Sequence, residues 1–370
     1  MSRIVTPKIH RSELLKVAHR PQLISIPYLQ TLNEADDISR FLLALQAEFK
    51  EYNLMMDPYV LELVELMNTG DDEAERQLFK IIQTHKTYCY ECLRKLVDKA
   101  SDIYNQLGGW ATDWYLRRCV KTYVGLLQPG DLTLDEWSDK EKQHLGVLLE
   151  RALRRADDMD RDLEVSLKVA ALIKTLVDEN TADFRGIIFV ERRAVAITLA
   201  HILREHPETQ ALFSVGAFVG STSSASLRKS GLADIVELKQ RPETLLEFRS
   251  GQKNLLVSTN VLEEGIDVPS CDNIMCFDKP KNLKSFIQRR GRARKVESKY
   301  FIMLTESEAR DKYALQWREL EEHMLKAYME DLRYAQLAEQ REQTIEHDNF
   351  ELRLSSTGYV SPNMTDRRLS

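Results

Sequence analysis

The decapeptide Ser285–Arg294 reads Ser-Phe-Ile-Gln-Arg-Arg-Gly-Arg-Ala-Arg, and Lys295 follows it. Its four arginines are adjacent or two residues apart, so they cannot all share one solvated helical face. Fixed guanidinium forks of this kind stabilise the charge on a γ-phosphoryl group during its transfer. A solvated or nucleic-acid-binding basic patch also explains the arginines, but it requires neither Gln288 nor Gly291. The residues that precede the decapeptide distinguish a phosphoryl-transfer site from a basic patch.

A short apolar run ending in Ser-Thr, Asn254–Thr259, predicts a buried strand. It leads into Asn260–Pro269, where Gly265 permits a turn that a Cβ would hinder and Asp267 offers an acceptor for a ribose hydroxyl. Open α/β sheets bind ligands at the carboxyl ends of their strands. A strand with incidental acids does not explain why the arginine-rich decapeptide follows after one more apolar strand, 273–278. The occurrence of these two segments in this order, 254–269 and then 285–294, therefore favours a nucleotide site.

Two earlier segments have the same strand-to-turn form. Residues 184–190 are apolar and precede a run of helical periodicity, 194–204. The next strand ends in Gly220-Ser221, where a small residue and a hydroxyl suit close approach of an RNA phosphate, although a simple turn explains them equally well. Strands alternate with helical patterns from about 166 to 305, which predicts a mostly parallel sheet covered on both faces.

In this order the segments resemble motifs of the superfamily 2 nucleic-acid helicases: 184–193 resembles motif IV, 254–269 motif V and 285–295 motif VI. The residues in these motifs resemble those of the double-stranded-RNA branch, and most of all those of the Dicer-like proteins of fungi. The resemblance covers most of residues 1 to about 340. It implies an α/β fold whose parallel sheet forms the second, RecA-like lobe of a helicase.

The resemblance also implies roles for nucleotide-site residues. Arg292 and Arg294 would be arginine fingers, and Gln288 would help place the γ-phosphate or the attacking water. Gly265 and Asp267 would border the nucleotide. Many helicases place the second finger three residues after the first, whereas the spacing here is two, as in the double-stranded-RNA branch.

Contacts with the RNA backbone are implied for a second group of residues at strand ends: Arg192, Gly220, Ser221 and Thr259. The cofactor implied is ATP with Mg²⁺, bound mainly by a first lobe that we expect to lie outside this chain. No glycine here is followed by lysine, so a Gly-Lys-Ser/Thr phosphate loop is absent. Asp72–Glu75 follows a Thr-Gly-Asp break and not an apolar strand, so we interpret it as the start of a helix.

The chain divides into five predicted segments. They are a connector from the first lobe (1–30), a helical insertion (31–160), the RecA-like lobe (161–305), C-terminal helices (306–346) and a flexible tail (347–370). In the insertion, the first helix is expected after a cap at Asn33, and Trp110 and Trp114 belong to another helix. By resemblance this bundle contacts the minor groove or the end of an RNA duplex, recognising its shape. Candidate contacts are Arg117, Arg118 and Lys121, although such charges usually form a solvated face.

Composition limits the function classes. The net charge of −6 means that nucleic-acid contacts must come from local basic clusters. No apolar run is long enough for a membrane span. Five scattered cysteines are typical of a reducing compartment, and Cys89 and Cys92 with His85 lack the further ligand of a zinc site, so we predict no metal site. We expect an intracellular protein, cytoplasmic, with the nucleus as the alternative.

The leading hypothesis is the C-terminal half of an ATP-dependent double-stranded-RNA helicase module in a Dicer-like, RNA-silencing ribonuclease. Its expected partners are double-stranded RNA and the first lobe and nuclease domains of the same protein. No cluster of acids resembles a ribonuclease III domain. The alternative of another class is a non-catalytic RNA-binding or scaffold half-helicase, which the absent phosphate loop favours. The C-terminal half of a DNA-repair helicase is a third alternative, but the residues of motifs V and VI resemble the RNA branch more closely.

Overall fold

The computed structural model describes residues 21–29, 38–127, 138–156, 162–220, 243–263, 266–295, 297–311, 316–317, 319–320 and 322–323. Contacts divide the chain into two compact units, 1–314 and 315–370, and all elements named below lie in the first. Of the predicted C-terminal helices, only α14 (Glu306–Arg310) is an assigned element within the described residues. The remaining prediction for 306–346 lies largely outside the described residues, as do the predicted tail and the proposed cap at Asn33.

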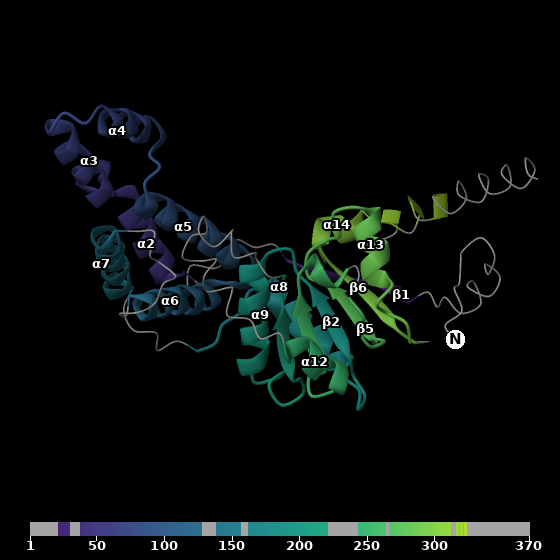
Figure 1. Cartoon of the computed structure of the whole chain (residues 1–370). Coiled ribbons are helices and arrows are strands. Elements are labelled where there is room, and N and C mark those ends of the chain that lie inside the picture. Colours follow the sequence, from purple (N-terminus) through teal and green to yellow (C-terminus); the bar gives the residue numbers. More distant parts are fainter. Residues whose placement is uncertain are drawn as a thin grey trace, which may run out of the picture. The chain divides into compact units, whose positions relative to one another are not determined.

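A six-stranded parallel sheet forms the centre of the lobe, in the order β1-β6-β5-β2-β4-β3 (Figure 1). The strands are β1 (Gln22–Tyr28), β2 (Gly186–Phe189), β3 (Val215–Phe218), β4 (Leu255–Ser258), β5 (Asn273–Cys276) and β6 (Lys299–Thr305). Every residue of β2, β4 and β5 is buried. Such continuous apolar runs are typical of parallel strands with both faces covered, so the predicted α/β lobe is confirmed.

The prediction that residues 1–30 are only a connector is wrong for 22–28. This segment is β1, which pairs in parallel with β6 over its whole length. It lies at the edge of the sheet, most of its residues are at least partly exposed, and it contains Pro27. Ile24, Ile26 and Tyr28 alternate with polar or proline residues and pack on the core, a strand pattern that the prediction overlooked; an edge strand also tolerates Pro27. The lobe therefore begins before the helical bundle in the sequence and continues after it.

Helices cover both faces of the sheet. On one face, α8 (Leu167–Asp178) and α9 (Arg193–Glu205) share a buried apolar cluster with Ile188 and Phe301. On the other face, α13 (Leu283–Arg290) packs Phe286 edge-on against Tyr300. Side chains of adjacent strand residues point to opposite faces, which explains how neighbours such as Tyr300 and Phe301 serve both layers. A further lobe helix, α12 (Glu243–Ser250), contacts β3.

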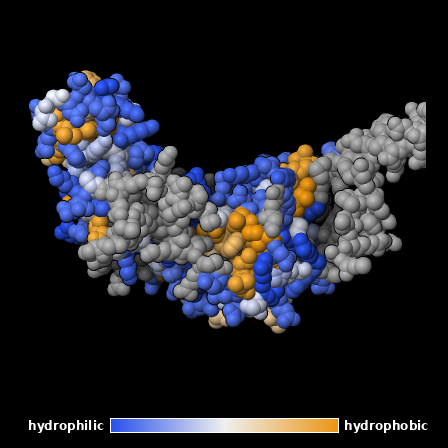
Figure 2. Space-filling model, in the orientation of Figure 1, coloured by the Kyte–Doolittle hydropathy of each residue, from blue (hydrophilic) through white to orange (hydrophobic). Residues whose placement is uncertain are grey.

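The predicted insertion is helical through most of its described residues. Its helices are α2 (Arg40–Lys50), α3 (Pro58–Asn68), α4 (Asp72–Thr84), α5 (Tyr88–Leu107), α6 (Gly109–Leu126) and α7 (Asp139–Arg155). They form what we call the bundle. The α3–α4 pair has an apolar cluster of its own and exposes large apolar side chains, among them Phe79 and Leu61. Figure 2 shows hydrophobic surface in the part that corresponds to α3 and α4 in Figure 1.

One predicted helix start agrees with the structure, while the cap predicted at Asn33 lies outside the described residues. Asp72–Glu75 forms the first turn of α4, which Asp71 caps by accepting hydrogen bonds from the amides of Glu73 and Ala74. The interpretation of this tetrad as a helix start is confirmed. A bundle helix begins at Arg40, where the Ser39 side chain accepts from the Leu42 amide. A hydroxyl directly before the apolar run is a well-placed cap, because its oxygen reaches the first free amides.

The bundle and the lobe share one apolar core. Buried residues from α2, α5, α6 and α7 belong to the same cluster as those of α8, α9 and the sheet. At the junction, the His201 ring of α9 stacks on Trp114 at 3.9 Å and on Trp110 at 5.9 Å. The sequence changes near residue 160 from the all-helical bundle to the α/β lobe. That this position is also a domain boundary stays a prediction. No helix within the described residues is long and apolar enough to cross a membrane.

His201 should make the junction acid-sensitive. Burial, followed by the charges of Arg204 and Arg118, lowers the pKa of His201 from 6.5 to about 4. Between these two pKa values the unfolded chain binds a proton that the folded chain does not. The free energy of unfolding therefore carries no penalty from His201 above pH 6.5, and it falls as the pH drops toward 4. His201→Phe keeps an aromatic ring without the titration. Melting temperatures measured across this window should fall less steeply for that variant, and identical slopes would contradict the expectation.

Candidate functional site

A cleft of about 560 Å³ lies at the carboxyl ends of the central strands. It is lined by residues that follow β2, β3, β4 and β5 and by one side of α13. They are Val190, Glu191, Gly220, Asn260, Val261, Glu263, Lys281, Asn282, Lys284, Ser285, Gln288 and Arg289. The three segments that resemble motifs IV, V and VI therefore meet at one edge of the sheet, as parallel strand ends require.

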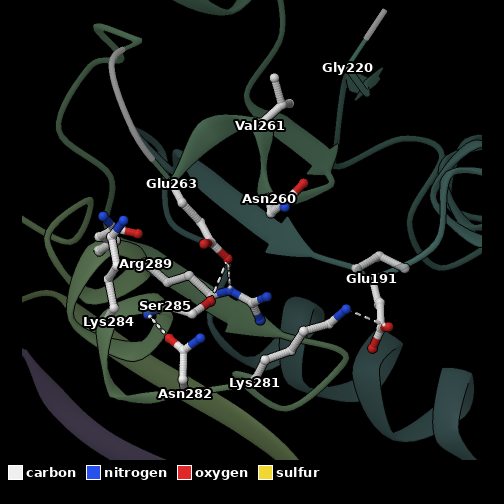
Figure 3. A pocket seen from close by; sticks show the side chains of 12 residues that line it. Glu191, Gly220, Asn260, Val261, Glu263, Lys281, Asn282, Lys284, Ser285 and Arg289 are labelled. Carbon is white, nitrogen blue, oxygen red and sulfur yellow. Dashed lines mark hydrogen bonds and ion pairs between the residues drawn. The ribbon is translucent and has the colours of Figure 1, made fainter. Parts of the chain in front are cut away.

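A buried ion pair joins the segments that resemble motifs V and VI. The Nε of Arg289 donates to the Glu263 carboxylate at 2.8 Å, and the Ser285 hydroxyl donates to the same oxygen at 2.6 Å (Figure 3). A terminal nitrogen of Arg289 also donates to the Asp278 carbonyl at 2.9 Å, and its guanidinium lies over the Phe189 ring. Burial alone would lower the pKa of Arg289, but the neighbouring Cys276 and Glu263 outweigh it and raise this pKa.

Arg289 and Glu263 are site residues that sequence reasoning did not identify. Arg289 is 3 % exposed, and its contacts hold the two segments together. A signal was present in the spacing, because Ser285 and Arg289 lie one helical turn apart and point to the same side. The sequence did not show that Glu263, rather than a neighbouring acid, would face them.

Arg292, the first predicted finger, is buried in this structure and is 8 % exposed. Its terminal nitrogens donate to the carbonyls of Ile266 at 2.9 Å and Glu263 at 3.0 Å. The side chain therefore holds the motif V segment by its backbone. Desolvation, and then the charge of Arg294, lowers the pKa of Arg292, and Asp267 acts in the opposite direction. Its buried Nε has no hydrogen-bond partner among the described residues, so the guanidinium keeps an N–H donor for a phosphate while it holds these carbonyls.

Arg294 and Gln288 are placed differently. Arg294 is exposed, and its Nε donates to the Gly291 carbonyl at 3.0 Å. Gln288 is half-buried and lines the cleft. Arg294 and Asp267 both influence the pKa of Arg292, so the three side chains lie within electrostatic range of one another. Their chemistry, two guanidinium groups and one carboxylate, fits a phosphate chain and a ribose.

Asp267 is exposed, and its carbonyl accepts two hydrogen bonds from Arg249 of α12, at 2.9 and 2.6 Å. These bonds fix the backbone at the position proposed to border a ribose. Gly265, the other predicted nucleotide-binding residue, lies outside the described residues. The roles of both stay predictions.

Gly220 lines the cleft just after β3. A Cβ added here would meet no atom closer than 3.7 Å, so packing within the described chain does not demand glycine. A ligand could therefore approach the backbone closely at this position. Thr259 follows β4 but is only 4 % exposed, and Ser221 lies outside the described residues. The proposed phosphate contacts of these residues stay predictions.

Arg192, the remaining predicted RNA contact, is paired with Asp102 of α5. It therefore connects the motif IV segment to the bundle, although 56 % of its side chain is still exposed. Its neighbour Glu191 lines the cleft and pairs with Lys281 at 2.8 Å (Figure 3). Lys281 thus neutralises a carboxylate at this rim that would otherwise repel a phosphate.

Cys89 and Cys92 are buried along α5, and both thiols are free of disulfides. Across the described part of the chain, no group of three or more His, Cys, Asp and Glu side chains could hold a metal ion. The guanidinium groups fit the phosphates of ATP, whereas a magnesium ion would need oxygen ligands from other residues.

Comparison with known proteins agrees with this geometry. The model of the helicase conserved C-terminal domain matches residues 167–297. Dicer-like protein 2 of Phaeosphaeria nodorum is 42 % identical over 96 % of this chain and 26 % of its own length. Dicer-like protein 2 of Aspergillus terreus is 39 % identical over 89 % of this chain and 24 % of its own length. Among solved structures, the C-terminal domain of the DEAD-box protein Dbp5 matches with a TM-score of 0.28 and 20 % identity, over 38 % of this chain and 70 % of that one.

The parallel sheet and the domain match together define residues 167–297 as a helicase C-terminal domain, which lies in a RecA-like α/β lobe. Within that class, its sequence is similar to the Dicer-like proteins of fungi, at 36–42 % identity over most of this chain. The chain spans about a quarter of the length of these relatives.

Proposed function

We propose that the cleft at the strand ends binds backbone phosphates of double-stranded RNA. We further propose that the region completes an ATPase together with a first RecA-like lobe elsewhere in the full-length protein. The observation that carries the proposal is the meeting of the three motif segments in one cleft with the two lysines Lys281 and Lys284 in its lining. An open glycine, hydroxyl and amide groups and basic side chains together suit a phosphate backbone.

In this proposal, ATP supplies the phosphoanhydride whose hydrolysis drives movement along RNA, and Mg²⁺ is held mainly by the first lobe. The chain's own residues neutralise the charge of the phosphates and orient the nucleotide. Arg294 would contact the γ-phosphate, and Arg292 would add its Nε, which has no hydrogen-bond partner among the described residues. Asp267 accepts a ribose hydroxyl. RNA silencing and an intracellular, cytoplasmic or nuclear location follow from the similarity to Dicer-like proteins and belong to the same proposal.

RNA binding by this chain tests the cleft. Lys281→Ala with Lys284→Ala should weaken binding of a blunt RNA duplex on the order of tenfold, equivalent to about 1.4 kcal/mol. The salt dependence of log Kd should also flatten by about 1 for each lysine–phosphate interaction that the variant removes. Removal of Lys281 exposes the charge of Glu191, which weakens binding further. Fluorescence anisotropy at several salt concentrations measures both quantities.

Lys174→Ala is the matched control, since Lys174 is exposed on α8 and does not line the cleft. Unchanged affinity in the double variant would place the RNA elsewhere. A DNA duplex that binds as tightly as RNA would instead favour the related DNA-helicase class. A full-length protein that binds RNA but shows no RNA-stimulated ATP turnover would favour the scaffold alternative.

A further inference from the structure

The last turns of α5 form the junction between the bundle and the cleft. Asp102 and Gln106 are four residues apart, so they lie on the same side of this helix. Asp102 pairs with Arg192, which follows β2. Gln106 accepts from the Lys168 ammonium at 3.3 Å, and its carbonyl accepts from the Ser166 hydroxyl at 2.7 Å. Helix α5 of the bundle therefore contacts the lobe at two places: the segment after β2 and the start of α8.

Lys168 lies in the first turn of α8, and only 11 % of its side chain is exposed. Its ammonium donates to Gln106 and, at 3.3 Å, to a carboxylate oxygen of Asp278. It also lies 3.8 Å from the centre of the Phe277 ring and 5.5 Å from that of Tyr28. Polar and aromatic partners therefore surround a buried charge, and moving Gln106 removes one of the acceptors that hold it.

Asp278 carries this connection into the cleft. Its second carboxylate oxygen accepts from the Glu191 amide at 2.7 Å, and its carbonyl accepts from Arg289 at 2.9 Å. Arg289 in turn pairs with Glu263, whose carbonyl accepts from Arg292. The series of contacts runs without a break from the end of α5 to the segments that resemble motifs V and VI.

We propose that Gln106, Lys168 and Asp278 are positioning residues through which RNA bound to the bundle sets the position of α13 and its arginines. The proposal rests on the proposed function, and it adds that the bound RNA duplex also contacts the bundle, as the resemblance of the bundle to helicase insertions implies. A buried lysine with an amide from the bundle and a carboxylate from the lobe suits this task, since displacing either partner leaves a charge poorly coordinated. Proximity alone does not establish coupling, so the test measures α13 directly.

Amide hydrogen exchange of the purified chain provides that measurement. Gln106→Ala removes the bundle's side-chain contact and keeps the Lys168–Asp278 ion pair. The amides of α13 should then exchange roughly five- to tenfold faster, as expected when one hydrogen bond of ordinary strength is removed. Asn105→Ala is the matched control, because Asn105 is the neighbouring exposed amide residue on α5. It should exchange like the wild-type chain throughout.

A second variant guards against a simple folding defect. Lys168→Met with Asp278→Asn removes both charges and keeps approximately the same volume. It should also speed exchange in α13 while leaving α7, which supplies none of the residues in this series, at the wild-type rate. Equal acceleration in α7 and α13 would mean general destabilisation and would overturn the inference. So would wild-type exchange of α13 in Gln106→Ala.

Adding a blunt RNA duplex completes the experiment. RNA should slow exchange of α13 in the wild-type chain, and Gln106→Ala should bind RNA with the same Kd yet show less than about half of that slowing. RNA binding with the full slowing retained would overturn the inference alone. A wild-type chain that does not bind RNA would contradict the proposed function, while the exchange comparison without RNA would still decide whether the connection exists.

Discussion

Arg292→Ala in the full-length protein is expected to lower ATP turnover by about 10³-fold or more, the range found when an arginine finger is removed. RNA affinity should change only a few-fold. Arg292 is buried against the motif V segment and does not line the proposed RNA cleft, so the substitution removes little positive charge from the RNA path. Two effects combine in turnover: the γ-phosphate has one guanidinium fewer, and the carbonyls of Glu263 and Ile266 are left without this donor.

Steady-state ATP hydrolysis with saturating RNA measures the effect, and anisotropy with labelled RNA measures affinity. Arg310→Ala is the control, because Arg310 is exposed on α14 and makes a surface pair with Glu306. Arg294→Ala separates the two effects, since Arg294 donates to the Gly291 carbonyl and not to the motif V segment. Equal decreases in turnover and RNA binding in Arg292→Ala would mean that the decapeptide is a basic RNA patch.

Periodicity and order in the sequence were enough to predict the lobe. Strands β2, β4 and β5 have both faces covered, so each is visible as a short, mostly apolar run. β1 was not predicted because an edge strand is stabilised by its pairing with β6, an interaction between residues far apart in the sequence. The only local signal is the short alternation of Ile24, Ile26 and Tyr28, which Pro27 weakens.

The candidate site was predictable as a set of segments but not as a set of contacts. The strand ends bring the segments together, which their order in the sequence already required. Which arginine of the decapeptide would be buried was not predictable, because α13 ends at Arg290 and the chain leaves the helix there. Arg289 consequently faces Glu263, whereas Arg294 is exposed. The pairing of Arg192 with Asp102 likewise depends on how the bundle packs on the lobe.

Arg289→Met is expected to lower the free energy of unfolding by about 3–5 kcal/mol, the cost of leaving one partner of a buried ion pair without the other. Glu263 would keep the Ser285 hydroxyl as a side-chain donor, and the Asp278 carbonyl would no longer have its guanidinium. Chemical denaturation of the chain measures the difference. Arg310→Ala should remain within about 0.5 kcal/mol of wild type, as is usual for exposed pairs.

A paired substitution tests whether the destabilisation comes from the unmatched carboxylate. Arg289→Met combined with Glu263→Leu removes both charges and leaves apolar side chains to pack near Phe189, so it should recover much of the stability that the single variant lacks. Arg289→Lys should recover less, because a lysine cannot span Glu263 and the Asp278 carbonyl with a planar fork. If the paired variant were less stable than either single one, the guanidinium would be stabilising through its ring and carbonyl contacts, and the ion pair would not be the main contribution.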